Sequence, residues 1–198
     1  MIRLFARCVA FCALFAAMSV HAQEAPDALV KKTVDEVLAT IKQTKDQKKL
    51  QDLAEARVVP YFDFRQMTQL AAGRTWSQAS AAQQEALEKA FRSLLVRTYT
   101  AALTRVSGDA KVDVKPASPP NADDVVVKTV ATEPGKQPVQ IDYRMARTAA
   151  GWKVYDVVVE NLSLVTSYRS SFQSEVARSG VDGLIKTLED KNRKGTEG

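Results

Sequence analysis

The sequence has 198 residues, a formal net charge of +5 and a hydrophobic content of 45%. This length is enough for one domain with a buried core, and the small charge excess does not indicate a nucleic-acid partner. The two cysteines, Cys8 and Cys12, and the only histidine, His21, all lie in the first 22 residues. Residues 23–198 therefore lack the side chains needed for thiol catalysis, disulfides, histidine triads and Cys/His zinc sites.

The first 22 residues have the pattern of a secretory signal peptide. Arg3 and Arg7 form a short basic region, and the apolar run that follows is too short to span a bilayer. The Val20-His21-Ala22 sequence supplies a small-x-Ala cleavage site. We therefore predict a signal peptide over 1–22, cleaved near Ala22, and a soluble exported chain over 23–198 that forms a single domain.

The first half of the exported chain is predicted to be helical. Apolar residues with helical spacing indicate one helix over 26–44 and a second over 46–58, which ends before Pro60. Asp63 is the expected N-cap of a short helix, and Gly73 is its expected end.

The longest helix is expected to begin at Ser80. The S-A-A-Q sequence over 80–83 predicts a capping box, and the apolar spacing continues for more than five turns until Gly108. The apolar face of this helix consists of Leu87, Phe91, Leu94, Leu95, Tyr99, Ala102, Leu103 and Val106.

The second half changes to the two-residue period of β-strands. We predict four strands, over 109–116, 124–132, 137–147 and 152–159, separated by turns rich in proline, asparagine and glycine. Successive strands with short turns form an antiparallel meander, and helices followed by strands indicate an α+β fold.

The strand over 152–159 is apolar on both faces. Trp152, Val154 and Val158 alternate with a second apolar set, Tyr155, Val157 and Val159, as expected of a strand that is covered on both sides. This alternation does not decide which of the two faces meets a ligand.

The chain after this strand is predicted to turn at Glu160-Asn161 and to become helical from Ser163. Asparagine tolerates the left-handed backbone that such a turn requires. Gly180 is expected to end this helix, and the segment VDGLIKTLEDK forms a final one.

Two long runs resemble the MlaC family, also called the toluene-tolerance auxiliary proteins. VVPYFDFRQMTQLAAGRTWSQASAAQQEALEKAFRSLLVRTYTAAL resembles the central helices of that family, and GWKVYDVVVENLSLVTSYRSSFQSEVARSGVDGLIKTL resembles its C-terminal signature. Asn161 is a departure, because the family pattern leads us to expect glycine there.

The resemblance implies a periplasmic carrier of glycerophospholipids that performs no chemistry. It implies helices wrapped around a curved, four-stranded NTF2-like sheet that encloses a lipid cavity, with phospholipid as cargo and no cofactor or metal. The implied partners are an inner-membrane ABC transporter complex with an MCE domain and an outer-membrane lipoprotein complex. A monomer is expected, and nucleic acid is not.

Periodicity then supplies candidate ligand contacts, which were selected as apolar residues on the faces that would enclose a cavity. They are Leu94, Leu95, Tyr99, Leu103, Val125, Val127, Val139, Ile141, Tyr143, Met145, Tyr155, Val157, Val159, Val165, Tyr168 and Phe172. Arginine pairs well with phosphate, so the head-group candidates are Arg147, which lies next to a turn, Arg144, Arg97 and Arg169.

Two alternatives remain open at this stage. The pairs Asp142-Tyr143 and Tyr155-Asp156 would supply the parts of an NTF2-like enzyme, although neighbouring residues on a strand point to opposite faces. The other alternative is a lipid-free periplasmic adaptor that binds only protein surfaces.

Overall fold

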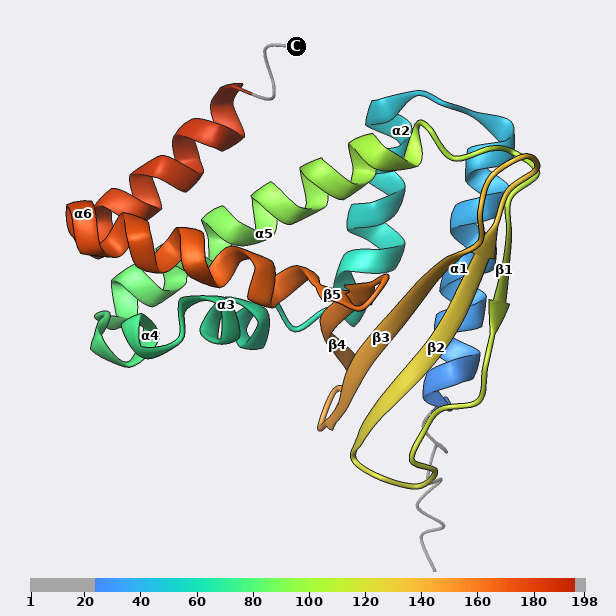
Figure 1. The fold of residues 1–198 in the computed structure, drawn as a ribbon, viewed down its shortest axis with the longest axis horizontal. Coiled ribbons are helices and arrows are strands. Elements are labelled where there is room, and N and C mark those ends of the chain that lie inside the picture. The colour runs from blue at the N-terminus through green and yellow to red at the C-terminus, as the bar shows by residue number, and fades with distance from the viewer. Residues whose placement is uncertain (1–23, 195–198) are drawn as a thin grey trace, which may run out of the picture.

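The N-terminal half of the protein is helical, as predicted, in the computed structural model, which describes residues 24–194 (Figure 1). The predicted signal peptide, with both cysteines and the histidine, and the last four residues lie outside the described residues. The helical elements of this half are α1 (Pro26–Gln43), α2 (Gln47–Leu53), η1 (Ala54–Val58), η2 (Val59–Tyr61), α3 (Phe64–Ala72), α4 (Arg74–Gln78) and α5 (Ala81–Leu103).

The predicted helix over 46–58 is not uniform. It begins as α2, widens into the π-helical turn η1 and tightens into the 3₁₀ turn η2. The prediction that helical structure ends before Pro60 is wrong, since Pro60 lies inside η2. Proline is tolerated in a first helical turn because its missing N–H has no partner there in any case.

The predicted caps of α3 and α5 are present. The Asp63 carboxylate accepts the Gln66 N–H at 2.8 Å, and Gly73 ends α3 with a φ of 58°. Ser80 and Gln83 form both hydrogen bonds of the capping box. However, α5 ends at Leu103, well before Gly108, because the chain closes into tight turns there. The short helix α4 was not predicted.

The C-terminal half forms one antiparallel sheet with the order β1-β2-β3-β4-β5. Four strands match the predicted meander, and the fifth corrects the expected number. The strands are β1 (Lys111–Val114), β2 (Asp124–Thr132), β3 (Val139–Thr148), β4 (Gly151–Val159) and β5 (Leu162–Ser163).

The additional strand β5 forms because the chain folds directly back on β4. Glu160 and Asn161 both have positive φ angles, of 48° and 65°, as a two-residue hairpin turn requires. Val159 then pairs with Leu162 and Val158 with Ser163. A strand of two residues has no periodicity to detect, which explains its absence from the prediction.

A β-bulge interrupts β4 at Tyr155. Arg144 of β3 pairs with Asp156 and Met145 pairs with Val154, so Tyr155 has no partner in the register. An extra residue exchanges the two faces of a strand beyond it. Val154 before the bulge and Val157 after it therefore lie on the same face of the sheet.

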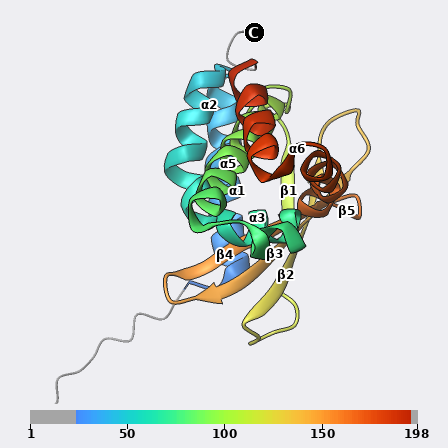
Figure 2. The same ribbon diagram turned by 90° about the vertical axis from the view of Figure 1, so that its left-hand side faces the viewer.

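Two hydrophobic cores hold the molecule together. One lies among α3, α4, α5 and α6 (Leu164–Lys194), and the other lies between α1 and the sheet. In Figure 1 the helices α3, α4 and α6 lie in one half of the molecule, the sheet with α1 lies in the other, and α5 extends from the first half towards the second. Figure 2 shows that α5 and α6 also run close together in the turned view.

The C-terminal helix α6 contains the predicted break. Gly180 has a φ of 71° and interrupts the helical backbone, so two helical segments meet at this residue. Among residues 24–194, no helix has both the length and the apolar character needed to cross a membrane.

The start of α6 is held by a buried carboxylate on the outer face of β4. Asp156 is 2% exposed, and its Oδ1 accepts the Val165 N–H at 3.3 Å. Its Oδ2 accepts the Ser163 hydroxyl at 2.7 Å and an N–H of the half-exposed Arg144 at 3.3 Å. Asp156 therefore joins the bulged strand to the helix that follows it.

The variant Asp156→Ala should lower the free energy of unfolding by about 3 kcal/mol, because it removes a buried charge that three donors share. Asp113→Ala, which breaks an exposed pair with Lys115, should change it by less than about 1 kcal/mol. Urea denaturation measures both values. Equal effects of the two substitutions would contradict the assigned role of Asp156.

Candidate functional site

An apolar cavity of about 460 Å³ lies between α1, α5, the segment 54–67 and the sheet. Pockets for small organic ligands measure about 300–1,000 Å³ and are mostly apolar. The cavity follows α1 from Leu29 to Ile41, which corresponds to a length of about 18 Å along a helix. This shape suits an elongated apolar ligand.

The sheet provides one wall of the cavity. Val139, Ile141, Tyr143 and Met145 alternate along β3 and all line it, as the sequence pattern predicted. On β4 the lining consists of Val154, Val157 and Val159. Because of the bulge, each of the two predicted faces of β4 contributes only part of this wall.

The long helix α5 provides a second wall. Leu95, Tyr99 and Leu103 line the cavity as predicted, together with Val96 and Thr100. Leu94, however, lies outside this cavity and packs in the helical core. The lining face of α5 is thus rotated slightly from the face that was inferred.

The third wall was not predicted as a ligand contact. It includes the apolar face of α1, whose helical spacing was used only to predict a helix over 26–44. It also includes the segment 54–67, in which η1 and η2 interrupt regular periodicity. The lining residues from these parts are Leu29, Val30, Thr33, Val34, Val37, Leu38, Ile41, Ala54, Val58, Val59, Tyr61, Phe62, Phe64 and Met67.

The structure places the predicted wall from α6 elsewhere. Val165, Tyr168 and Phe172 face α5 in the helical core and do not line the cavity. The ring of Phe91 meets Tyr168 edge-on at a centroid distance of 5.0 Å and Phe172 at 5.1 Å. Helical spacing correctly identified an apolar face of α6, but this face packs against the helix α5 and not against the cavity.

Three further candidates from the sheet also lie outside the cavity. Val125 and Val127 are fully covered in the core between α1 and the sheet. Tyr155 occupies the bulge, and its hydroxyl donates to the Asp124 carboxylate at 2.9 Å. Its bulge position removes it from the alternation on which the prediction relied.

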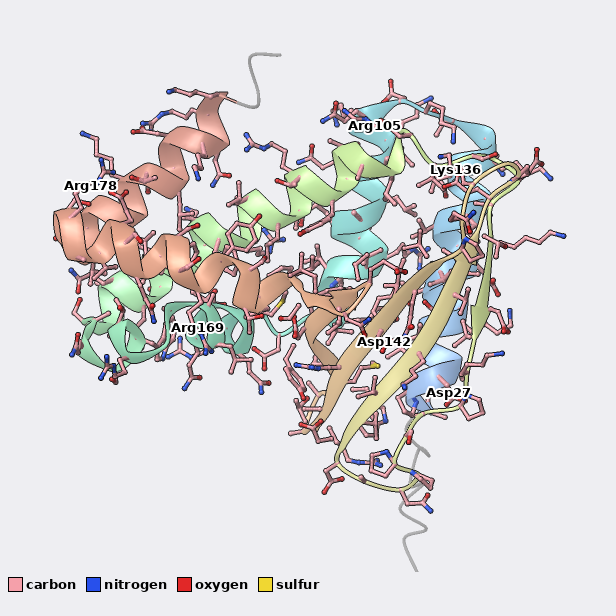
Figure 3. All side chains as sticks on the ribbon, in the orientation of Figure 1. Asp27, Arg105, Lys136, Asp142, Arg169 and Arg178 are labelled. Atoms are coloured by element: carbon pink, nitrogen blue, oxygen red, sulfur yellow. The ribbon has the colours of Figure 1, made fainter. Side chains whose placement is uncertain are left out.

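None of the four predicted head-group arginines lines the cavity. Arg144 pairs with Asp156 at 3.3 Å, and Arg97 donates to the carbonyl of Asn192 in α6. Arg169, labelled in Figure 3, donates to the Leu70 carbonyl of α3 at 2.8 Å. Each of these three arginines thus has a partner within the fold.

Arg147 was the preferred head-group candidate, and it too is engaged. Its Nε donates to Asp123 at 2.8 Å, and its guanidinium lies 4.6 Å from the centre of the Trp152 ring. It holds the end of the β2–β3–β4 sheet together and does not reach the cavity wall.

The cavity contains few groups that ionise near neutral pH. Among its described lining residues, Glu133 is the only carboxylate. Hydrogen bonds from Lys136 and from the Ser107 N–H, both at 2.9 Å, lower the pKa of Glu133. Lys136 lies at the end of the molecule that also carries Arg105 (Figure 3). Glu133 is therefore an ionised rim group and not a proton donor at neutral pH.

Two tyrosines of the cavity, Tyr99 and Tyr143, remain neutral under the same conditions. Burial raises the pKa of Tyr143 to about 12, and burial with a smaller effect of Tyr168 raises that of Tyr99 to about 12. Asp142, Asp156 and Tyr155 lie outside the lining, so neither of the two Asp–Tyr pairs places both of its members in the cavity. The described lining therefore lacks the acid–base pair that the enzyme alternative requires.

Residues 24–194 contain no group of three or more side chains suited to hold a metal ion. The polar groups of the lining are confined to hydroxyls of threonine and tyrosine and to Glu133. The site can therefore solvate apolar chains and accept a few hydrogen bonds.

Comparison with solved structures gives a phospholipid-binding protein from Ralstonia solanacearum, which was crystallised in complex with a phospholipid. The two proteins share 38% sequence identity with a TM-score of 0.79, and the match covers 87% of this chain and 99% of that one. The family described as "MlaC protein" matches residues 31–190, which include every wall of the cavity except the first residues of α1. The resemblance seen in the sequence is confirmed, and this chain belongs to the MlaC family.

Proposed function

We propose that this protein is a periplasmic carrier of glycerophospholipids that holds acyl chains in the cavity between α1, α5 and the sheet. The observation that carries the proposal is the nearly uniform apolar lining of that cavity in a chain of the MlaC family. The Ralstonia relative, crystallised with a phospholipid, supports the class of ligand.

The physical need for such a cavity follows from acyl-chain hydration. Burial of each methylene stabilises the lipid by about 0.8 kcal/mol, so about thirty methylenes carry a gross penalty of about 25 kcal/mol in water. A lipid crosses an aqueous compartment only if a protein removes this penalty. A lining without nucleophiles or acid–base pairs does this without altering the lipid.

The wider role that we propose is transport between the outer and inner membranes in a pathway that maintains lipid asymmetry. The proposed partners are an outer-membrane lipoprotein complex and an inner-membrane ABC transporter complex with an MCE domain. Family membership and the signal-peptide pattern of residues 1–22 support this role. We propose that the protein acts as a monomer.

The lipid-free adaptor is the alternative that the cavity disfavours. A protein that only binds other proteins has no need of an apolar cavity along the length of α1, and close packing would stabilise it more. The enzyme alternative lacks a carboxylate next to Tyr143 within the described lining.

Protein purified from its native compartment should contain about one diacyl phospholipid per chain, because an empty apolar cavity of this size is costly. Organic extraction followed by mass spectrometry measures the content. Stable protein isolated without lipid would contradict the carrier function.

The variants Ile141→Glu and Val157→Glu should each reduce the bound lipid at least about tenfold, because an ionised side chain would enter the cavity. Val158→Glu is the matched control, since its neighbour Val157 lines the cavity and it does not. Circular dichroism establishes that each variant is folded. Unchanged lipid content in folded Ile141→Glu and Val157→Glu proteins would show that the lining is assigned incorrectly.

Cells that lack this protein should become sensitive to detergent, because phospholipid would accumulate in the outer leaflet of the outer membrane. Growth on detergent plates and the labelling of surface-exposed phospholipid measure this defect. Restoration by the wild-type gene but not by Ile141→Glu would link it to the cavity, whereas equal restoration by both would contradict the transport role.

A further inference from the structure

A second, smaller pocket borders the apolar cavity. It measures about 130 Å³ and lies between α1 and the segment of η1 and η2. Thr33 and Tyr61 line both the pocket and the cavity, so the two spaces share a wall. The other pocket residues include Lys32, Glu36 and Arg57, so the pocket is charged where the cavity is apolar.

The helix α1 and the segment of η1 and η2 separate the apolar cavity from the charged pocket. On α1, Val30, Val34 and Val37 line the cavity, while Lys32 and Glu36 on the adjacent stripe line the pocket. On the second segment, Val58 and Val59 face the cavity, while Arg57 and Pro60 border the pocket. A phospholipid has the same division between its acyl chains and its head group.

The charged groups of the pocket are available for a ligand. Among residues 24–194, Arg57 makes no hydrogen bond or ion pair, and the Tyr61 hydroxyl has no hydrogen-bond partner. Within the described part of the chain, the ammonium of Lys32 has only a long contact of 4.0 Å with Glu24. These groups differ from the four arginines considered above, each of which is engaged in the fold.

The local backbone also distinguishes this position. Arg57 belongs to the π-helical turn η1, and such turns are rare and occur frequently at functional sites. Lys153 of β4 donates to the Pro60 carbonyl at 2.5 Å, which brings another positive charge to the same region. Positive charge therefore gathers where the wall of the cavity becomes polar.

We infer that Lys32 and Arg57 bind the phosphate diester of the carried lipid, with the Tyr61 hydroxyl between the phosphate and the acyl chains. This inference rests on the proposed carrier function and assigns the head-group site within it. Arginine and lysine form charge-assisted hydrogen bonds with phosphate oxygens. The acyl chains extend from this point into the cavity.

The charges of the pocket also select a class of head group. Lys32 and Arg57 carry two positive charges and Glu36 carries one negative charge, so the pocket matches a single phosphate diester. Glu36 is suited to accept an ammonium group, and it repels a second phosphate. The ligand class is therefore a glycerophospholipid with one phosphate.

The test compares two ligands with the same acyl chains. Purified protein is incubated with vesicles of dioleoylphosphatidylcholine that contain equal amounts of deuterated dipalmitoylphosphatidylethanolamine and deuterated dipalmitoylglycerol. Wild-type protein should take up the phospholipid in preference to the diacylglycerol. The variant Lys32→Gln/Arg57→Gln should lower this ratio roughly tenfold or more, as expected for the loss of charge-assisted hydrogen bonds.

The matched control is Lys89→Gln/Arg74→Gln, which removes one lysine and one arginine that are exposed and lie outside both spaces. Its ratio should equal that of the wild type. An unchanged ratio in Lys32→Gln/Arg57→Gln would overturn the head-group site while leaving the carrier function intact. Wild-type protein that takes up no lipid, including the dioleoylphosphatidylcholine of the vesicles, would overturn both.

A final experiment distinguishes between a lipid head group and free phosphate as the ligand of the pocket. Calorimetry measures the binding of inorganic phosphate to wild-type and variant protein. If the variant loses phosphate binding but keeps its lipid ratio, the pocket serves a free anion and the proposal is wrong. A reduced lipid ratio in the variant supports the proposal whatever the affinity for inorganic phosphate.

Discussion

The β-bulge at Tyr155 is the constraint on which the arrangement of the site depends. It places Val154, Val157 and Val159 on the cavity face of β4, although strict alternation would separate Val154 from the other two. It also directs Asp156 to the opposite face, where the carboxylate accepts the Val165 N–H at the start of α6. One inserted residue thus completes the apolar wall and anchors the C-terminal helix to the sheet.

The cavity exists because two separate cores support the walls around it. The helices α3 to α6 pack on one another through Phe91, Tyr168 and Phe172, and α1 packs on the sheet through Leu29 and Val30. Some core residues, including Leu29, Val30 and Leu95, also line the cavity, so each core borders it directly. The protein therefore keeps an apolar space that a single, fully packed core would fill.

Local sequence signals determined much of the fold, and contacts between distant segments determined the rest. The Ser80 capping box, the Gly180 break and the alternation of β3 were predictable, since each depends on neighbouring residues. The cavity face of β4 was not predictable, because a bulge leaves no trace in the alternation. Helical spacing identified the apolar faces of α1 and α6, but it does not indicate whether a face meets a ligand or another helix. For that reason the lining of α1 was missed, and α6 was assigned to the wrong wall.

Photo-crosslinking from the acyl chain tests most directly whether the space between α1, α5 and the sheet holds lipid. Protein would be loaded with a phosphatidylethanolamine that carries a diazirine in mid-chain, irradiated, digested and analysed by mass spectrometry. The structure predicts crosslinks to peptides that contain the cavity face of α1, the segment 54–67, and Ile141 or Tyr143 of β3. Crosslinks confined to Val165–Phe172 of α6, or to the outer surface, would contradict the account.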